Sequence, residues 1–314
     1  MSEVIINNQI GLRIRYNSYN HVELIKKCIV PFLSDFNNKN IFENFLITKE
    51  FTRGASLLIV FSNQNTNSLN KISDAALKCF SDFLNQNPSK KEETKANSEK
   101  EWFMNYPENT IHILSESEME RYNLSQNFNQ QFSKARDIFN TNFTKCAIET
   151  LKNIEEKDYE AILTLLYELL LSIVSSFNLS KYESKSILSS IFSKISKGRL
   201  NIENQKVKTI KLTEKEKTIK NQLEKDFQDN YENIYSYINE NWIENVNNKG
   251  QKTNYDFINC LAVNNNEISK EFNLSKKYSK MMIEYSILNF FSILNLNKYT
   301  YLFALYSLSN CLND

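Results

Sequence analysis

The spacing of the apolar residues changes along the chain, and this change narrows the possible folds more than any other feature. In the first third, Gly11–Tyr16 alternates apolar side chains with two arginines, which is the period-two pattern of a half-buried strand. From about Asn127 onward, apolar residues recur every three or four positions, as in amphipathic helices. The pattern predicts an α+β fold, in which a small, mainly antiparallel sheet from the N-terminal third packs against a largely helical C-terminal two thirds.

The first 115 residues carry signals for short strands and helices in turn. Two apolar runs, Phe42–Thr48 and Ser56–Phe61, flank a turn-like segment and predict a β-hairpin or two adjacent strands. The other elements expected in this part are a helix over His21–Phe36 that Pro31 kinks or restarts, a helix over Ser68–Leu84, an exposed loop over Asn85–Lys100 and a strand over Thr110–Leu114.

The rest of the chain predicts a series of helices. Asp158 suits the N-cap of one helix, and Ser180 with Glu183 forms the capping-box pattern of the next. We expect residues 1–314 to form a single domain with a mixed part, 1–115, and a mainly helical part, 116–314. The expected helices cover Phe128–Ile154, Asp158–Phe177, Ser180 to about Lys197, Thr213–Trp242, Tyr255–Phe272, Tyr278–Asn295 and Lys298–Leu312.

Glycine is scarce, with four in 314 residues, and this scarcity excludes several functional loops. Neither G-x-x-x-x-G-K-S/T nor G-x-G-x-x-G occurs, and the nucleophile elbow G-x-S-x-G is absent as well. The chain has only two histidines and five widely separated cysteines, without Cys-x-x-Cys spacing, so neither a zinc site nor a disulfide framework is expected. We therefore expect no metal and no bound cofactor.

The charges nearly cancel, with 38 Lys plus Arg against 37 Asp plus Glu. The net charge of +1 argues against nucleic acid and against an anionic membrane as partners. Met1–Ile10 lacks the pattern of a signal peptide, and the longest apolar stretch, Ala161–Val174, is shorter than the roughly 20 residues of a membrane span. We expect a cytoplasmic protein. Only six of its basic residues are arginines, so the position of each arginine is informative.

Three motifs follow one another in a characteristic order. A strand with Arg13 and Arg15 precedes a helix, a hairpin over Phe45–Gly54 leads into the strand Leu57–Phe61, and Glu116–Tyr122 precedes a further helix. This order resembles the thiopeptide-type bacteriocin biosynthesis domain, which is the C-terminal, glutamate-elimination part of lantibiotic dehydratases and also occurs in stand-alone proteins. The sharpest match is to the family pattern E-P-E-x-E-R-Y-G-G, because the third motif keeps its three glutamates, its arginine and its tyrosine.

The departures from the family pattern concern the residues that eliminate glutamate. Where the family's hairpin has two later arginines, this chain has Leu58 and Val60. Where the family's C-terminal helix has a histidine, this chain has Asn289. Elimination needs cations for the departing carboxylates and a base for the α-proton. The resemblance therefore points to a branch of the family that dispenses with this apparatus, the stand-alone pyridine synthases of thiopeptide pathways.

The resemblance to these synthases implies a formal [4+2] aza-cycloaddition between two dehydroalanines of a leader-bearing precursor peptide. The ring becomes aromatic after it loses water and the leader peptide as an amide. This chemistry needs proximity of two distant dehydroalanines and one or two groups that donate and accept protons, and it needs no metal or redox cofactor. The implied partners are the ribosomally made precursor peptide with its leader and other enzymes of the same pathway.

Two other functions stay open at the level of the sequence. Arg13 and Arg15 are retained, as a glutamate-elimination subunit of a split lantibiotic dehydratase would require. The lost arginines and the lost histidine argue against that function. A non-catalytic domain that binds the peptide or a pathway enzyme as a scaffold is the second alternative.

The catalytic residues are expected on the helix over Tyr278–Asn295. Helical spacing places Ser279, Tyr285, Ser286 and Asn289 on one broad polar and aromatic face. Because Asn289 occupies the place of the family's histidine, this face is expected to look into the active site. Tyr285 is the expected proton donor, with Ser286 or Ser279 as its hydrogen-bond partner. The alternative is an aromatic core face with a few satisfied hydroxyls.

The substrate-binding residues are expected on the N-terminal strands. Arg13 and Arg15 share one strand face and would form a cationic rim for the peptide, unless they simply face solvent. Lys49 and Arg53 flank the hairpin turn and would extend that positive surface. The glutamates of the third motif alternate, which predicts one strand face carrying Glu116, Glu118 and Glu120.

Overall fold

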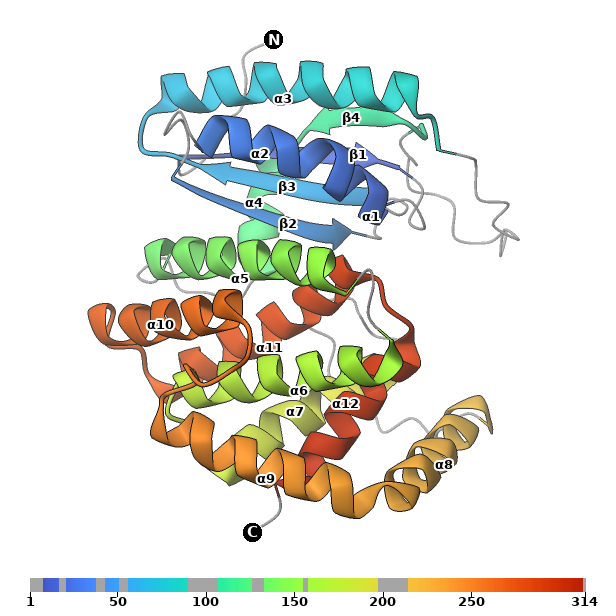
Figure 1. The fold of residues 1–314 in the computed structure, drawn as a ribbon. Coiled ribbons are helices and arrows are strands. Elements are labelled where there is room, and N and C mark those ends of the chain that lie inside the picture. The colour runs from blue at the N-terminus through green and yellow to red at the C-terminus, as the bar shows by residue number, and fades with distance from the viewer. Residues whose placement is uncertain are drawn as a thin grey trace. The chain divides into compact units, whose positions relative to one another are not determined.

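The computed structural model describes residues 8–16, 21–37, 43–50, 56–89, 107–125, 133–154, 158–196 and 214–312 (Figure 1). The chain forms two compact units, and each is described by itself. The first comprises Met1–Thr144 together with Ser292–Leu294, and the second comprises Lys145–Phe291 together with Asn295–Asp314. Whether the whole chain acts as one domain stays a prediction.

The first unit contains a four-stranded antiparallel sheet with the strand order β2-β3-β1-β4. The sheet confirms the α+β class, and both runs expected to form a hairpin are adjacent strands. The elements of this unit are β1 (Gln9–Arg15), α1 (His21–Leu24), the π-helical turn η2 (Ile25–Ile29), α2 (Val30–Asn37), β2 (Asn44–Glu50), β3 (Ser56–Ser62), α3 (Thr66–Gln86), β4 (Thr110–Ile113), α4 (Glu116–Ser125) and the first part of α5 (Ser133–Asn153).

The helix expected over His21–Phe36 is continuous, and the effect of Pro31 is a change of helix type. Proline has no N–H to donate, and its ring clashes with the carbonyl four residues earlier. The chain responds with the π-helical turn η2, after which the amide of Val30 donates to the carbonyl of Ile25 five residues back. Pro31 then stands near the start of α2, and the apolar side of the segment stays turned to the core.

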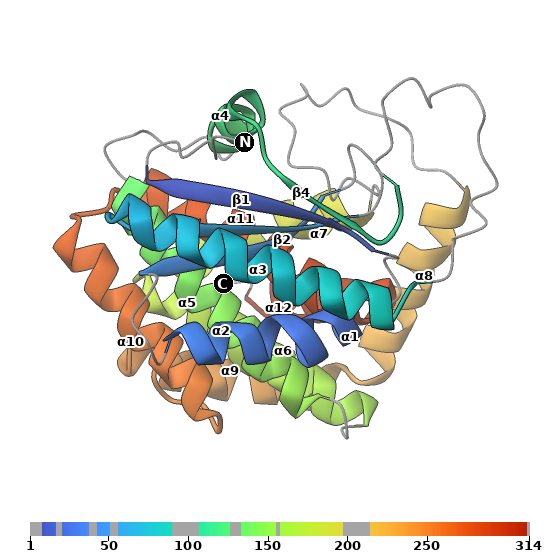
Figure 2. The same ribbon diagram turned by 90° about the horizontal axis from the view of Figure 1, so that it is seen from above.

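One face of the sheet is apolar. Ile10, Leu12 and Ile14 of β1 are fully buried there beside the matching residues of β3. Helices α2 and α3 cover this face, as the edge-to-face contact of Phe32 with Phe61 shows, at 6.2 Å between ring centroids. In the view from above, α3 and α4 lie on opposite sides of β1 (Figure 2).

The opposite face carries the arginines and is called the arginine face below. From β1 it presents Gln9, Gly11, Arg13 and Arg15, and from β3 it presents Leu58 and Val60. Leu58 and Val60 form a small buried cluster with Leu114, which follows β4, and with Met119 of α4. A Cβ atom on Gly11 would lie 2.6 Å from Leu114 Cδ1 and 2.7 Å from Met119 Sδ, so glycine lets α4 approach the sheet closely.

The exposed edge of the sheet at β2 is covered by a side chain of α5. Thr141 Oγ1 accepts from the amide of Phe45 at 2.9 Å and lies 3.1 Å from the carbonyl oxygen of the same residue. A threonine thus satisfies backbone groups that would otherwise be open to pairing with another strand.

The second unit is helical. It contains the end of α5, then α6 (Tyr159–Ser176), α7 (Lys181–Ser196), α8 (Glu214–Asp229), α9 (Tyr231–Asn247), α10 (Asp256–Glu271), α11 (Lys276–Leu294) and α12 (Lys298–Cys311). Helix α6 is its core and packs against α9, α10 and α12. By length and composition alone α6 could cross a membrane, but 72% of its apolar window is buried inside the protein, as is usual for the central helix of a soluble fold.

Local capping signals of this part are confirmed. The carboxylate of Asp158 accepts from the amide of Ala161 at 2.8 Å, and Glu183 accepts from the amide of Ser180 at 3.1 Å. One expectation was wrong, because the helix predicted over Thr213–Trp242 is interrupted at Asn230. Asn230 leaves helical geometry, with φ −122° and ψ 13°, and asparagine favours such junctions because its side chain bonds nearby backbone.

The turn between α9 and α10 is fixed to α6 by two contacts. Gly250 has φ +80°, and a Cβ atom there would lie 2.4 Å from the carbonyl oxygen of Ser172. The hydroxyl of Ser172 donates to the Gly250 carbonyl at 2.6 Å. The buried carboxylate of Glu168 accepts from both the amide and the side chain of Asn254, at 2.9 and 2.7 Å.

Left-handed backbone is formed almost entirely by asparagine in the described residues. Six non-glycine residues have positive φ, and all except Lys249 are asparagines: Asn8, Asn109, Asn178, Asn273 and Asn295. Asn178, Asn273 and Asn295 follow the ends of α6, α10 and α11, where glycine is the usual residue.

Candidate functional site

Helix α11 carries all four residues expected to be catalytic. Ser279, Tyr285, Ser286 and Asn289 are buried, with exposed fractions of 3%, 7%, 2% and 4%. At 3.6 residues per turn they share one side of the helix. The four side chains therefore share one buried side of α11, as expected; that this side is catalytic stays a prediction.

The other side of α11 is held by α7 through charged side chains. Glu284 accepts from the hydroxyl of Ser190 at 2.8 Å and pairs with Lys194 at 2.5 Å. Glu183 at the start of α7 pairs with Lys276 at 3.2 Å and with Lys280 at 3.3 Å. Because these residues lie on the side away from Tyr285, the polar contacts with α7 fix the helix without using the candidate face.

The hydroxyl of Ser286 is distinctive among the polar groups of this face. It is buried and has no hydrogen-bond partner among the described residues. Tyr285 and Asn289, in contrast, both have interaction partners. A buried hydroxyl without a partner costs free energy, on the order of 1–3 kcal/mol. Six other buried side-chain hydroxyls of the described residues, Ser184 and Ser307 among them, are in the same condition, so this feature alone does not mark Ser286 as a ligand site.

The arginine face differs from the expected cationic rim. Arg13 is only 3% exposed, and its guanidinium lies 2.7 Å from the carboxylate of Glu118. Arg15 lies 3.5 Å from the carboxylate of Glu108. Both arginines do share one strand face, as predicted, but their charges are offset by carboxylates. Arg15 is the more accessible of the two, with 18% of its side chain exposed.

Glu118 has two functions at the start of α4. Its carboxylate accepts from the amide of Ser115 at 3.0 Å, from the hydroxyl of Ser115 at 2.9 Å and from Arg13. Burial opposes ionisation, but these hydrogen bonds outweigh it and lower the pKa of Glu118 to about 2. The carboxylate is therefore an anion throughout the neutral range.

The strand face predicted for the three glutamates was wrong. Glu116, Glu118 and Glu120 lie in helix α4, where only Glu118 turns inward and the other two are exposed. The segment starts a helix and not a strand, because Ser115 and Glu118 form a capping box there. The side chains of Arg121 and Tyr122 lie outside the described residues.

Lys49 does not extend the arginine face. It pairs with Leu57, which pairs with Ile14, so its side chain leaves the sheet on the apolar face. Burial there lowers the pKa of Lys49 to about 8. Arg53, the second cation expected at the hairpin, lies outside the described residues.

His112 lies opposite Arg13 in the neighbouring strand β4. Its Nε2 hydrogen-bonds with the hydroxyl of Thr110 at 2.8 Å. Burial first, and the charge of Arg13 second, lower the pKa of this imidazole. Neutral His112 and the ion pair of Arg13 thus form one polar patch on the arginine face. The sequence did not reveal this group, because its members come from three separate segments.

The described residues offer no set of side chains that would bind a metal ion. Among the residues that the structure describes, no three His, Cys, Asp or Glu side chains gather as metal ligands would. The groups available for chemistry on α11 are hydroxyls and an amide, which can donate, accept and relay protons but cannot hold a metal tightly.

This combination of a small antiparallel sheet and a helical remainder with the face on α11 is the fold of thiopeptide-type biosynthesis proteins. The pyridine synthase TbtD, from thiomuracin biosynthesis, superposes with a TM-score of 0.67 at 11% sequence identity, over 97% of this chain and 97% of that chain. TsrL superposes with a TM-score of 0.58 at 10% identity, over 96% and 93%. At such identities the likeness shows the fold, and it confirms the fold that the order of motifs implied.

Comparisons by sequence gave no further relatives. No protein-family model matches the chain, and no curated protein matches it.

Proposed function

We propose that the chain is an enzyme of thiopeptide-type peptide biosynthesis that forms a pyridine-type ring. Its substrate would be a leader-bearing precursor peptide with two dehydroalanines, and its reaction a formal [4+2] aza-cycloaddition in the cytoplasm, without a cofactor. The observation that carries the proposal is the likeness of the fold to TbtD over 97% of both chains. Helix α11 supports the proposal, because its buried face carries hydroxyl groups and the amide of Asn289. Asn289 stands where the family has a histidine.

The reaction divides into steps with simple proton requirements. An amide beside the first dehydroalanine tautomerises to its imidic acid, which gives a 2-azadiene. The second dehydroalanine supplies the two-carbon partner, and two new carbon–carbon bonds close a six-membered ring: one joins the two Cβ atoms, and the other joins the imidic-acid carbon to Cα of the second dehydroalanine. The ring then loses its hydroxyl as water and its amide substituent as the leader peptide amide, which leaves an aromatic pyridine. The sequence needs no oxidant or reductant: ring closure forms two carbon–carbon bonds, and each elimination breaks one carbon–oxygen or carbon–nitrogen bond while a base removes a ring proton and a donor protonates the leaving group.

The residues of α11 receive the following roles in this proposal. Tyr285 donates a proton to the leaving hydroxyl or to the leaving amide. The partnerless hydroxyl of Ser286 binds the amide oxygen that tautomerises. Ser279 and Asn289 orient these groups. A water-poor site strengthens such hydrogen bonds, and all four side chains are at most 7% exposed.

The role of the arginine face in this proposal is to position the peptide. Arg15, the more exposed of the two arginines, contacts the peptide, and Arg13 with Glu118 holds α4 beside it. Arg53 is also proposed to bind the peptide, whereas Lys49 is not, because its side chain leaves the sheet on the apolar face. Other enzymes of the same pathway are the expected further partners.

The test is incubation of the protein with a leader peptide that carries two dehydroalanines at varied spacing. Mass spectrometry should show loss of water and release of the leader as an amide. Tyr285→Phe and Ser286→Ala should reduce product formation, whereas the matched variant Tyr182→Phe, at a residue 73% exposed, should not. Absence of product with every plausible substrate would contradict the proposal.

Two parallel experiments, one with a glutamylated peptide and one on leader-peptide binding, separate the two alternatives. A glutamate-elimination subunit would convert a glutamylated peptide to its dehydrated form, although both arginines suited to that task are paired with carboxylates. A scaffold protein would bind the leader peptide, and Tyr285→Phe would leave the output of the pathway unchanged.

A further inference from the structure

Two of the five free cysteines lie next to each other in the first unit. Cys28 is on the π-helical turn η2 and Cys79 is on α3, and these two elements pack against each other. The thiol of Cys28 donates a hydrogen bond to the sulfur of Cys79. The strands β2 and β3 lie between these two cysteines in the sequence, so the fold, and not chain proximity, brings the two thiols together.

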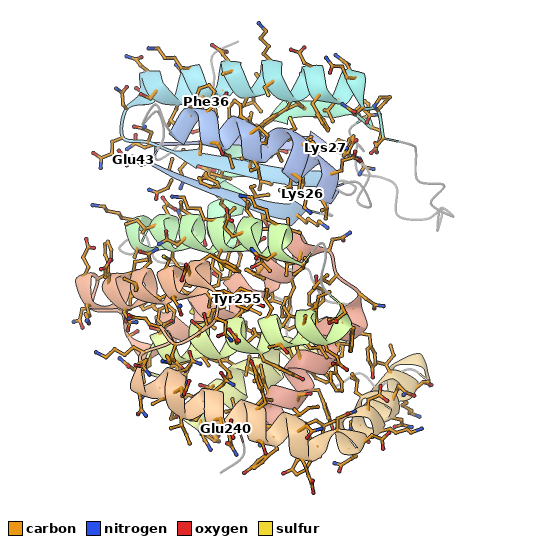
Figure 3. All side chains as sticks on the ribbon, in the orientation of Figure 1. Lys26, Lys27, Phe36, Glu43, Glu240 and Tyr255 are labelled. Carbon is orange, nitrogen blue, oxygen red and sulfur yellow. The ribbon has the colours of Figure 1, made fainter. Side chains whose placement is uncertain are left out.

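Aromatic rings fix η2 and the start of α2 against α3 beside this pair. Phe32 follows Cys28 by about one turn, and its ring meets that of Phe80, the neighbour of Cys79, edge-on with 5.0 Å between the centroids. The ring of Phe36, which is labelled in Figure 3, stacks on Phe32 at 4.5 Å. Because Phe32 and Phe80 are buried, their packing restricts the movement of the two segments, and the two sulfur atoms stay close to each other.

The two thiols differ in their access to solvent and in their hydrogen bonding. Cys28 is only 4% exposed, whereas Cys79 is half-buried. Burial raises the pKa of both thiols, and the carboxylates of Asp82 and Asp35 add to this shift at Cys79. The hydrogen bond from Cys28 acts in the opposite direction at Cys79, because it stabilises the thiolate of Cys79. Cys79 is therefore the sulfur that a dissolved reagent meets first.

We propose that Cys28 and Cys79 are an oxidative modification site, at which a low-molecular-weight disulfide converts the thiol pair into a reversible internal disulfide. The thiolate of Cys79 attacks one sulfur of the small disulfide R–S–S–R, which forms a mixed disulfide and releases R–S⁻. Cys28 then gives up its proton and attacks the Cys79 sulfur, which expels the second R–S⁻. In sum, the two thiols lose two electrons and two protons, and the small disulfide gains them as two molecules of R–SH.

Proximity favours the internal disulfide over a lasting mixed disulfide. A disulfide bond is about 2.05 Å long and needs Cβ atoms roughly 3.5–4.5 Å apart, so thiols in hydrogen-bond contact can join after small side-chain rotations. The second attack takes place within one molecule, which raises its effective concentration. Cys260, in contrast, is exposed on α10 and has no thiol in hydrogen-bond contact, so the same reagent should leave a mixed disulfide there.

The rate of the reaction follows from the thiol chemistry. Only the thiolate attacks a disulfide, and a raised pKa keeps the thiolate fraction of Cys79 small at neutral pH. The internal disulfide therefore forms slowly, and faster as the pH rises. It links η2 to α3 and shares no residue with the face on α11.

The test treats the full chain with cystamine, a small disulfide whose two ammonium groups suit the aspartates near Cys79, at mildly alkaline pH. After the remaining thiols are alkylated, peptide mass spectrometry should find Cys28 joined to Cys79 about tenfold more often, or better, than any other pair. Cys260 should carry the cystamine half as a mixed disulfide, and dithiothreitol should reverse both products.

Three variants assign the roles of the cysteines. Cys79→Ser should lose the internal disulfide, and Cys28→Ser should keep a mixed disulfide on Cys79, because the second attack is missing. Cys260→Ser is the matched control and should form the internal disulfide as the wild type does. Circular dichroism checks that all variants are folded.

Three results would overturn the proposal. One is a folded wild type in which Cys79 stays a mixed disulfide beside a free Cys28 thiol. Another is a bridge that joins other pairs, such as Cys146 with Cys260, as often as Cys28 with Cys79. The last is a folded chain in which Cys260 reacts while Cys28 and Cys79 stay reduced, although the same cysteines form bridges in urea.

Discussion

Arg13 on β1 and Glu118 on α4 form an ion pair of 2.7 Å, although 105 positions separate them in the chain. The same carboxylate caps the start of α4 through Ser115. One side chain therefore connects the first turn of a helix to the arginine face of the sheet. This arrangement also neutralises an arginine that would otherwise be a buried, unpaired cation.

Glu118→Gln should destabilise the fold by about 1–3 kcal/mol, because Arg13 loses its counter-charge. The pKa of Glu118 is about 2 in the folded protein, against an ordinary value of 4.5. Its contribution is therefore complete above pH 4.5 and is lost as the pH falls towards 2. Thermal melts of the wild type between pH 2 and 7 should show this loss, and Glu118→Gln should show less of it. Glu120→Gln, at an exposed position of the same helix, is the control and should behave as the wild type does.

His21 should make the stability depend on pH in a second, higher window. Its side chain is fully buried, and its Nε2–H donates to the carbonyl of Tyr16 at 2.6 Å. Burial, aided by the nearby charge of Lys49, lowers the pKa of His21 to about 3 from 6.5. The unfolded chain takes up a proton below pH 6.5 and the folded chain does not, so stability should fall by up to about 1.4 kcal/mol per pH unit from pH 6.5 towards 3.

Denaturant unfolding between pH 5 and 7 tests this effect above the range in which Glu118 titrates, although His112, whose pKa is lowered as well, adds to the same slope. His21→Phe, which cannot take up a proton, should reduce the slope in that interval even if it lowers the stability itself. An unchanged slope in His21→Phe would show that other groups dominate.

Gly250→Ala should destabilise the second unit by roughly 2–4 kcal/mol. The new Cβ would lie 2.4 Å from the carbonyl oxygen of Ser172, and alanine would be strained at φ +80°. The neighbouring Lys249 has φ 53°, a backbone conformation that glycine adopts without strain, so Lys249→Gly should instead stabilise the fold by up to about 1 kcal/mol. Chemical denaturation of the two variants measures both changes in the free energy of unfolding, a loss for Gly250→Ala and a gain for Lys249→Gly. Equal effects of the two changes would contradict this account.

Tyr285→Phe should reduce ring formation at least 10²-fold if Tyr285 is the proton donor, as is typical for loss of a general acid. Ser286→Ala should reduce it as well while stabilising the fold slightly, because it removes a buried hydroxyl without a partner. Single-turnover mass spectrometry and thermal melts of the same samples separate the two effects. A Ser286→Ala variant that is less stable than the wild type would mean that the hydroxyl has a structural partner.

The sequence predicted the elements whose signal is local. The alternation of Gly11–Tyr16 gave β1, and the helical spacing after residue 133 gave α5 to α12, apart from the break at Asn230. The face on α11 was also predictable, because residues three and four apart on a helix share a side. The capping box of Ser115 and Glu118 was present in the sequence too, but the alternating glutamates favoured the interpretation as a strand.

The relationships that the sequence did not reveal are those between distant segments. No local pattern pairs Arg13 with Glu118 or Arg15 with Glu108, since such pairs depend on how strands and helices meet. The side of the sheet taken by Lys49 was equally hidden. Phe45, Leu46 and Ile47 are all buried, so β2 is apolar on both faces. The sequence pattern therefore does not show which residues of β2 face which side of the sheet.

The asparagines in left-handed turns bear on how such a protein can be traced through evolution. Where helices α6, α10 and α11 end, asparagine adopts the backbone conformation that glycine adopts elsewhere. Where a relative has glycine at such a turn, a comparison of residue identities scores a mismatch, whereas a comparison of backbone paths scores a match. Substitution of glycine by asparagine at such turns can therefore lower the sequence identity of two proteins without changing their backbone.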